Sequence, residues 1–278
     1  GKDKVNGSML SLAFGGFAGI FLLFVLSYLL WGKLNWKYNL GLIILSFVMG
    51  FNLLFSKSRG AWLGFLGSSF SLGWLKDKRL VIGLLIGLMI ISVFLPKNIL
   101  YRFKSSFITS VNVSNWNNLD RNMRSNLMRV ALWKSSIEMW QDHFINGVGL
   151  GRFSIVNKNN DYANDYSSIN FQKYSHALST LFLFLASSGT VGFLAFSWLM
   201  FKILQVLYKF YYKINNKNWS LFILGSLGAV ILFNIQGLTE FNFGDTEPVR
   251  FFWFLIALNM IVINKFRLDN KGVKEKSV

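Results

Sequence analysis

Long apolar runs constrain this chain more than any other feature of its sequence. Most are close to the roughly 20 residues that an α-helix needs to cross a hydrocarbon core about 30 Å thick. They are continuously apolar and rich in Phe, which favours helices over the alternating pattern of a membrane β-barrel. We therefore expect an all-α integral membrane protein with about seven transmembrane helices, at Met9–Trp31, Tyr38–Phe55, Ala61–Leu75, Leu80–Leu95, Ala177–Tyr208, Trp219–Leu238 and Phe251–Ile263, of which the third and the last are short.

The composition agrees with this class. Apolar residues make up 53% of the chain, aromatic residues 17% and charged residues only 15%, a balance that no ordinary soluble domain needs. The chain starts with Gly, and its first apolar run has no cleavage-site pattern of small residues, so we do not expect that run to be a signal peptide. We interpret the chain as a fragment of a larger polytopic protein.

The basic residues predict the orientation in the membrane. A net charge of +17 in a soluble protein would suggest nucleic acid, but here Lys and Arg lie in short connections between apolar runs, as in the cytoplasmic loops of membrane proteins. The four clusters fall on one side if the helices alternate: Lys33 and Lys37; Lys76, Lys78 and Arg79; Lys209, Lys213 and Lys217; Lys265 to Lys276. We expect four transmembrane helices in residues 1–95, a large periplasmic loop in 96–175, three helices in 176–264 and a basic cytoplasmic tail in 265–278.

Arg59 is the first candidate site residue. It lies in the turn Ser56-Lys57-Ser58-Arg59-Gly60 between two apolar runs, at the expected external rim of the membrane. A charged side chain there is costly unless it snorkels, pairs or binds a ligand. Arg59 is therefore either an interfacial anchor or part of a site.

The expected loop in 96–175 is too long to be a simple connection and has its own order. Apolar residues recur at steps of three or four from a cap near Asp120, which predicts an amphipathic helix through Met123, Leu127, Val130, Ile137 and Trp140. We expect this helix to lie on the membrane surface or across the mouth of a cavity. Gly147, Gly149 and Gly151 after it predict a helix stop and tight turn, and the polar stretch Asn157–Tyr174 predicts a mobile loop.

His176 is the second candidate, because it precedes the fifth apolar run on the same expected face as Arg59. Its ordinary pKa of about 6.5 suits a general base that takes a proton from a hydroxyl, although a histidine that caps a helix at the interface is the alternative. His143, beside Asp142, is more simply explained by solvent exposure. No metal-ligand spacing, hydrolase order or phosphate-binding Gly-Lys motif points to a metal, a hydrolase or an ATPase.

These residues together resemble the O-antigen ligase and O-antigen polymerase family. The resemblance runs from Phe55 to Gly192: Ser58-Arg59-Gly60-Ala61-Trp62-Leu63 opens a helix, a large loop holds Arg129 and Trp133, Gly147-Val148-Gly149-Leu150-Gly151-Arg152-Phe153 follows, and His176 and Ser188-Gly189-Thr190-Val191-Gly192 come next. Family members typically have about a dozen helices. The family often has Asn after the histidine, but this chain has Ala177, so a role for that Asn in orienting the acceptor does not carry over.

The resemblance implies transfer of a glycan from an undecaprenyl-diphosphate-linked donor to an acceptor sugar, such as the lipid A core of lipopolysaccharide, on the periplasmic face of the inner membrane. Neither a cofactor nor a metal is expected, since guanidinium groups can neutralise the diphosphate. The implied catalytic residues are Arg59, on the diphosphate, and His176, as the base of an inverting reaction. The expected substrate-binding residues are Arg129, Arg121, Arg152 and Glu240, and Asp245, Glu247 and Arg250 share the expected face with Glu240.

Other functions stay open at this point. Within the family, the enzyme is a ligase, a polysaccharide polymerase or a protein O-oligosaccharyltransferase, which differ in the acceptor. A transporter or flippase of lipid-linked glycan would predict internal repeats and charges near the membrane midplane, and neither is evident in the sequence. A non-catalytic membrane scaffold would leave His176 dispensable.

Overall fold

A computed structural model describes residues 11–78, 81–82, 119, 121–159, 162–169, 171–244 and 246–275 of the chain. The chain divides into two compact units, which we describe separately. Unit 1 comprises Gly1–Ile82, Leu199–Gly237 and Asn242–Val278, and unit 2 comprises Gly83–Trp198 and Leu238–Phe241. The expected fourth transmembrane helix and the expected cap at Asp120 lie almost entirely outside the described residues.

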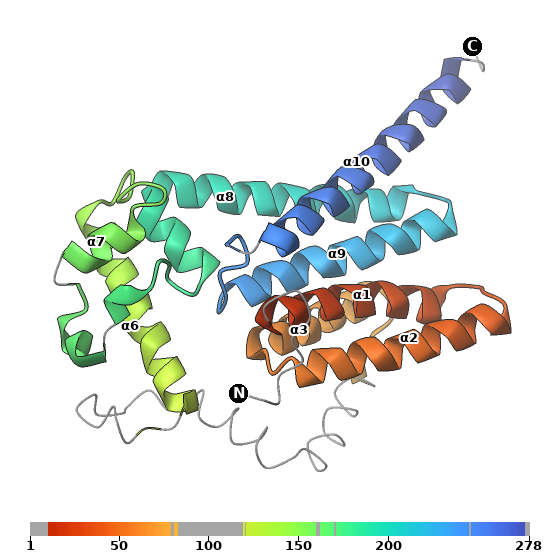
Figure 1. The fold of residues 1–278 in the computed structure, drawn as a ribbon. Helices are drawn as coiled ribbons and strands as arrows, with labels where there is room; N and C mark the ends of the chain where they lie inside the picture. Colours follow the sequence, from red (N-terminus) through yellow and green to blue (C-terminus); the bar gives the residue numbers. More distant parts are fainter. Residues whose placement is uncertain are drawn as a thin grey trace. The chain divides into compact units, whose positions relative to one another are not determined.

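All the regular secondary structure in the described part of the chain is helical (Figure 1). Its helices are α1 Ser11–Trp31, α2 Trp36–Phe55, α3 Arg59–Lys76, α6 Arg121–Asp142, α7 Phe153–Asn159, α8 Thr180–Lys213, α9 Lys217–Gly237 and α10 Thr246–Glu275, with two 3₁₀ turns, η2 Asn164–Ile169 and η3 Phe171–Lys173.

Within the described residues, five helices are long and apolar enough to cross a membrane: α1, α2, α8, α9 and α10. The expected transmembrane run Ala61–Leu75 is helical as α3 but is not among the five. The last run is not short, because it belongs to α10, which is 30 residues long and extends into the predicted basic tail. The fold is therefore that of an all-helical membrane protein over the part described, with five supported spans.

Unit 1 is built around α9, whose side chains are mostly buried. Glycines let its neighbours approach closely: a Cβ at Gly16 of α1 would lie 2.3 Å from the Gln236 amide oxygen, and one at Gly64 of α3 would lie 2.9 Å from the Leu232 carbonyl oxygen. Small residues at such contacts are how helices pack tightly in lipid, where no hydrophobic effect drives them together. By contrast, α2 exposes most of its apolar side chains, as a lipid-facing helix does.

Unit 2 has its own hydrophobic core. The predicted amphipathic helix is confirmed as α6, but its buried face runs through Leu127, Ala131 and Met139, and Ile137 is exposed. The prediction missed this face because Ala131 and Ser135, although fully buried, give little hydrophobic signal in a sequence. The core is completed by Phe153, Phe171, Ala177 and Ala186. The stretch predicted as a mobile loop contains the end of α7 and both 3₁₀ turns, η2 and η3, and its Phe171 is fully buried in this core.

A kink in α8 is fixed by the loop that follows α6. Gly189 has φ 63° and ψ −165°, which removes the helical hydrogen bonds that Thr190 and Val191 would otherwise donate to Ala186 and Ser187. The two N–H groups and the two carbonyl oxygens that lose these bonds form hydrogen bonds with the loop instead. The bonds are Thr190 N–H to Phe144 O (2.9 Å), Val191 N–H to Ile145 O (3.3 Å), Val148 N–H to Ala186 O (2.9 Å) and Gly149 N–H to Ser187 O (3.0 Å).

We call this pairing of residues 144–149 with residues 186–191 the interlock. Gly147, with φ 66°, faces Gly189 so closely that a Cβ on Gly147 would lie 2.5 Å from the Gly189 nitrogen. Trp140 adds a side-chain bond, from its Nε1 to Thr190 Oγ1 (2.9 Å). The predicted helix stop and tight turn after α6 is confirmed. The two glycine-containing segments, which the sequence places 42 positions apart, form one structural element.

Candidate functional site

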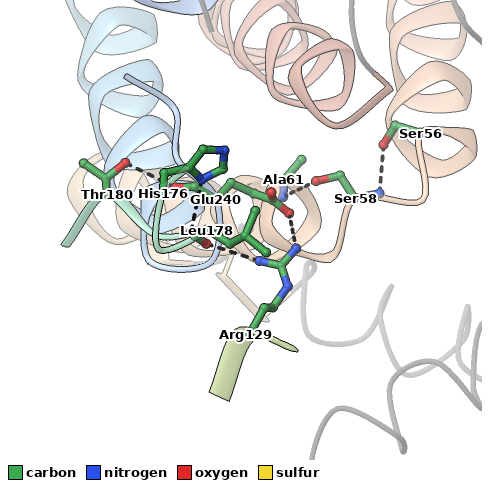
Figure 2. Close-up of polar contacts among 8 residues, drawn as sticks. All are labelled: Ser56, Ser58, Ala61, Arg129, His176, Leu178, Thr180 and Glu240. Atoms are coloured by element: carbon green, nitrogen blue, oxygen red, sulfur yellow. Dashed lines mark hydrogen bonds and ion pairs between the residues drawn. The ribbon is translucent and has the colours of Figure 1, made fainter. Parts of the chain in front are cut away.

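Leu178 is the centre of a polar cluster in unit 2 (Figure 2). It lies just before α8 and has φ 51°, a left-handed conformation that is strained for a residue with a branched side chain. Its N–H donates to His176 Nδ1 (3.2 Å), and its carbonyl oxygen accepts from Arg129 (3.3 Å). One strained peptide segment therefore links the predicted base to an arginine that is 49 residues away in sequence.

Glu240 holds the other half of the Arg129 guanidinium. Arg129 donates to the Glu240 carboxylate at 3.0 Å, and their side chains are only 14% and 11% exposed. The Glu240 carbonyl oxygen accepts from both the backbone N–H (3.1 Å) and the hydroxyl (3.2 Å) of Thr180. Because Thr180 begins α8, these bonds fix the segment Leu238–Phe241 to the start of that helix.

His176 also contacts this segment, since its ring lies 5.2 Å from the ring of Phe241. The cluster thus combines three stretches of chain: α6, the turn before α8, and the segment after α9. Removing one partner from a buried ion pair costs about 3 to 5 kcal/mol, because the other charge is left uncompensated. We infer that Glu240 fixes the position of Arg129.

Two buried N–H donors near the cluster have no partner in the described part of the chain. They are Arg129 Nε and Trp133 Nε1, one helical turn apart on the same face of α6. The Trp133 ring stacks on Phe182 at 5.0 Å, which fixes its direction. An unsatisfied buried donor costs about 1 to 3 kcal/mol, so this face of α6 favours an oxygen acceptor from beyond the described residues, such as water or a ligand.

The Arg59 turn is built separately, in unit 1. Ser58 caps α3 by accepting the Ala61 N–H on its hydroxyl (3.3 Å), and the Ser56 hydroxyl accepts the Ser58 N–H (3.2 Å) (Figure 2). Both serines are fully buried, and Lys57 between them has φ 56°. Two of the three non-glycine residues with positive φ in the described chain, Lys57 and Leu178, thus lie within two residues of Arg59 or His176.

Arg59 is the first residue of α3 and is half-buried. A cation at the amino end of a helix is unfavourable by about 0.3 to 1 kcal/mol, because the helix dipole is positive there. The first turn contains no acidic residue to offset it. The guanidinium and the helix end therefore both favour an anion at this position.

Other predicted site residues do not join these groups. Arg121 and Arg152 are exposed, and neither forms a hydrogen bond or an ion pair with the unit 2 cluster among the described residues. His143 is exposed at the end of α6, as expected. Glu247 and Arg250 are exposed on the first turns of α10 in unit 1, and Asp245 lies outside the described residues.

Polar side chains of α6 bind the segment Tyr162–Tyr166 through an ion pair and hydrogen bonds. Lys134 forms an ion pair with Asp165, and Glu138 accepts the backbone N–H of Ala163. Tyr162 donates to Asp142 at 2.8 Å. Burial, together with that hydrogen bond, raises the pKa of Tyr162 to about 12. The hydrogen bond to Asp165 raises the pKa of Lys134.

Sequence reasoning missed Leu178, Thr180 and Trp133 as parts of the site. A left-handed Leu has no sequence signal, because the strain comes from tertiary contacts. The sequence named Trp133 only as a member of the family motif and indicated no role for it. No group of His, Cys, Asp or Glu in the described residues is arranged to hold a metal ion.

The comparison with known families assigns the chain to a family. The family model described as O-antigen ligase matches residues 44–197, which is more than half of the 278 residues. The chain belongs to the O-antigen ligase family. The matched region contains Arg59, Arg129 and His176, whereas Glu240 lies beyond it. A search of curated proteins returned no match.

Proposed function

We propose that the protein transfers a glycan from a polyprenyl-diphosphate donor, such as undecaprenyl diphosphate, to a hydroxyl of an acceptor sugar. The observation that supports this most strongly is the Arg129 guanidinium, held by Glu240 and Leu178 beside His176. The family supports glycan transfer in general. The donor, the inverting course and the periplasmic location of the reaction are parts of the proposal.

Arg129 fits a diphosphate because its orientation is fixed before substrate arrives. Two of its nitrogens are held by the protein, and its buried Nε has no acceptor in the described chain. A pre-positioned guanidinium stabilises charge that develops on a leaving group without reorganisation during the reaction. Trp133 Nε1, one turn away, supplies a second buried donor.

Arg59 is proposed independently as a donor-binding residue of unit 1. Its position at the amino end of α3 favours a phosphate group for the reasons given above. The buried Ser56 and Ser58 hydroxyls hold the backbone of the turn, so that Arg59 starts from a fixed position.

The direct test is a reconstituted reaction. The purified protein, in vesicles with a polyprenyl-diphosphate-linked oligosaccharide and an acceptor glycan, is expected to form a product with a new glycosidic bond, measured by mass spectrometry. Arg129→Lys keeps the charge but loses the planar fork, so we expect kcat/KM to fall about a hundredfold or more. Arg59→Lys tests unit 1 in the same way.

Arg267→Lys is the matched control, because Arg267 lies on α10, over the ring of Phe210, far along the chain from both candidate groups. We expect it to behave as wild type. Equal activity of Arg129→Lys and Arg267→Lys would reduce Arg129 to a structural residue. Accumulation of donor on the other side of the vesicle without any new glycosidic bond would replace the proposal with transport.

The acceptor decides between ligase, polymerase and protein O-glycosyltransferase. Three acceptors offered in parallel, a lipid A core, a second donor-linked repeat unit and a Ser- or Thr-containing peptide, separate these activities by the product formed.

A further inference from the structure

We propose that His176 acts in the transfer as a hydrogen-bond donor from Nε2 to the diphosphate leaving group, and not as the general base. This inference rests on the proposed function. The role of the ring depends on which of its two nitrogens carries the hydrogen. The contact between the ring and the backbone decides this.

The contact that fixes the ring is the bond from the Leu178 N–H to His176 Nδ1, at 3.2 Å. A backbone N–H is always a donor, so Nδ1 must be the acceptor. In a neutral imidazole one nitrogen carries hydrogen and the other does not. With Nδ1 as the acceptor, the hydrogen is on Nε2.

This arrangement is held in place by the surrounding structure. The left-handed conformation of Leu178 directs its N–H at the ring, and its carbonyl oxygen is engaged by Arg129. The Phe241 ring packs against His176 at 5.2 Å. Two charged side chains lie at this turn: Arg129, which donates to the Leu178 carbonyl oxygen, and Glu240, which forms an ion pair with Arg129. Rotating the imidazole to present Nδ1 elsewhere would leave the Leu178 N–H without this acceptor.

The chemical consequence is that Nε2 has no lone pair with which to accept a proton from the acceptor hydroxyl. It has an N–H that can donate to an oxygen where negative charge develops. As the bond between the anomeric carbon and the phosphate oxygen breaks, its electron pair stays on that oxygen, next to a phosphorus atom that Arg129 is proposed to hold. A donor at this place stabilises the transition state more than the ground state.

The proton balance does not require a protein base. The acceptor oxygen forms the new bond to the anomeric carbon and loses its proton. The departing diphosphate gains a terminal phosphate oxygen, and such a group has a second pKa of about 6, so it can take up that proton directly or through water. One C–O bond forms, one C–O bond breaks, and no further reactant is needed.

Three substitutions separate the possible roles of His176 in the reconstituted transfer assay. His176→Gln places an amide N–H near the position of Nε2 but supplies no base. His176→Asn places an amide oxygen near Nδ1, which keeps the Leu178 contact but does not reach as far as Nε2. His176→Phe keeps the ring contact with Phe241 and loses both nitrogens.

We expect His176→Gln to retain activity within about tenfold of wild type, and His176→Asn and His176→Phe to lose about a hundredfold or more, the usual effect of removing one such donor. The pH profiles of wild type and His176→Gln should have the same shape. Equal losses in all three variants, with an acid limb in the wild type that is missing from His176→Gln, would show a general base and overturn the inference.

Retained activity in His176→Asn or His176→Phe would also overturn it, because that result assigns His176 a structural role. Failure of the proposed function looks different: the wild-type protein itself would form no glycosidic bond. The thermal unfolding temperature of each variant is measured beside its rate. Only variants that unfold at the wild-type temperature are used to decide between these outcomes.

Discussion

Gly189→Ala tests the interlock between the α6 loop and the α8 kink. The backbone at Gly189, with φ 63° and ψ −165°, lies in a region that is essentially restricted to glycine, and an alanine there costs about 1 to 3 kcal/mol. The added Cβ would lie 2.3 Å from the Ile145 carbonyl oxygen and 2.6 Å from the Gly147 nitrogen. Both are backbone atoms, so no side chain can move aside to relieve the contact.

The two segments must therefore separate, which weakens the four backbone hydrogen bonds of the interlock. Each is worth about 1 kcal/mol net, so the total cost is on the order of 4 kcal/mol or more. That is a large part of the 5 to 15 kcal/mol that typically stabilises a folded protein. We expect a large drop in the unfolding temperature in detergent, followed by Trp fluorescence, to which Trp140 at the interlock contributes.

Two control variants isolate the parts of this cost. Gly151→Ala also has a positive φ, 76°, but its Cβ would meet nothing within 4 Å, so it reports backbone strain alone. Gly50→Ala lies within helix α2, where its Cβ would meet nothing within 4 Å, so it reports the loss of a glycine without strain or a close contact. We expect both to lose far less stability than Gly189→Ala. If all three unfold at the same temperature, the interlock does not stabilise the protein and the reasoning is wrong.

Three further predictions follow from other contacts. Ser58→Ala removes the cap that accepts the Ala61 N–H, and we expect a loss of about 0.5 to 2 kcal/mol in a denaturant titration, whereas an unchanged midpoint would refute the cap. Because the pKa of Tyr162 is raised from 10.0 to about 12, the stability that it contributes is present below pH 10 and is lost as the pH rises towards 12, and Tyr162→Phe should abolish that part of the pH dependence. A cysteine at Leu150 should react with an impermeant thiol reagent in spheroplasts, and one at Asp77 should not; both positions are exposed, so the reverse labelling would invert the proposed topology.

The sequence by itself determined the class and family of the protein and named most residues of its candidate site. Apolar runs longer than 18 residues must be helices in a membrane, because only helical hydrogen bonding satisfies the backbone in lipid without a partner strand. The periodic apolar residues predicted α6, and glycines predicted the turn after it. The order of Arg59, Arg129, the glycine-rich segment and His176 was enough to predict the family that the family model matches.

Sequence reasoning was wrong or silent where long-range contacts decide the outcome. The buried face of α6 is set by Ala131 and Ser135, whose small side chains permit close packing but carry no apolar signal. The run expected from Phe251 to Ile263 is a much longer helix, since α10 extends well beyond its apolar residues.

Only the tertiary structure joined Arg129 to Glu240, two residues 111 positions apart, and made Leu178 the link between Arg129 and His176. The strained conformation of Leu178 illustrates the reason. A leucine has no intrinsic preference for positive φ, so it adopts that conformation only where hydrogen bonds and packing from distant segments offset the cost. The hydrogen on His176 Nε2 follows from the same contact, because a ring nitrogen takes its protonation from the group that it faces, and folding alone brings that group to it.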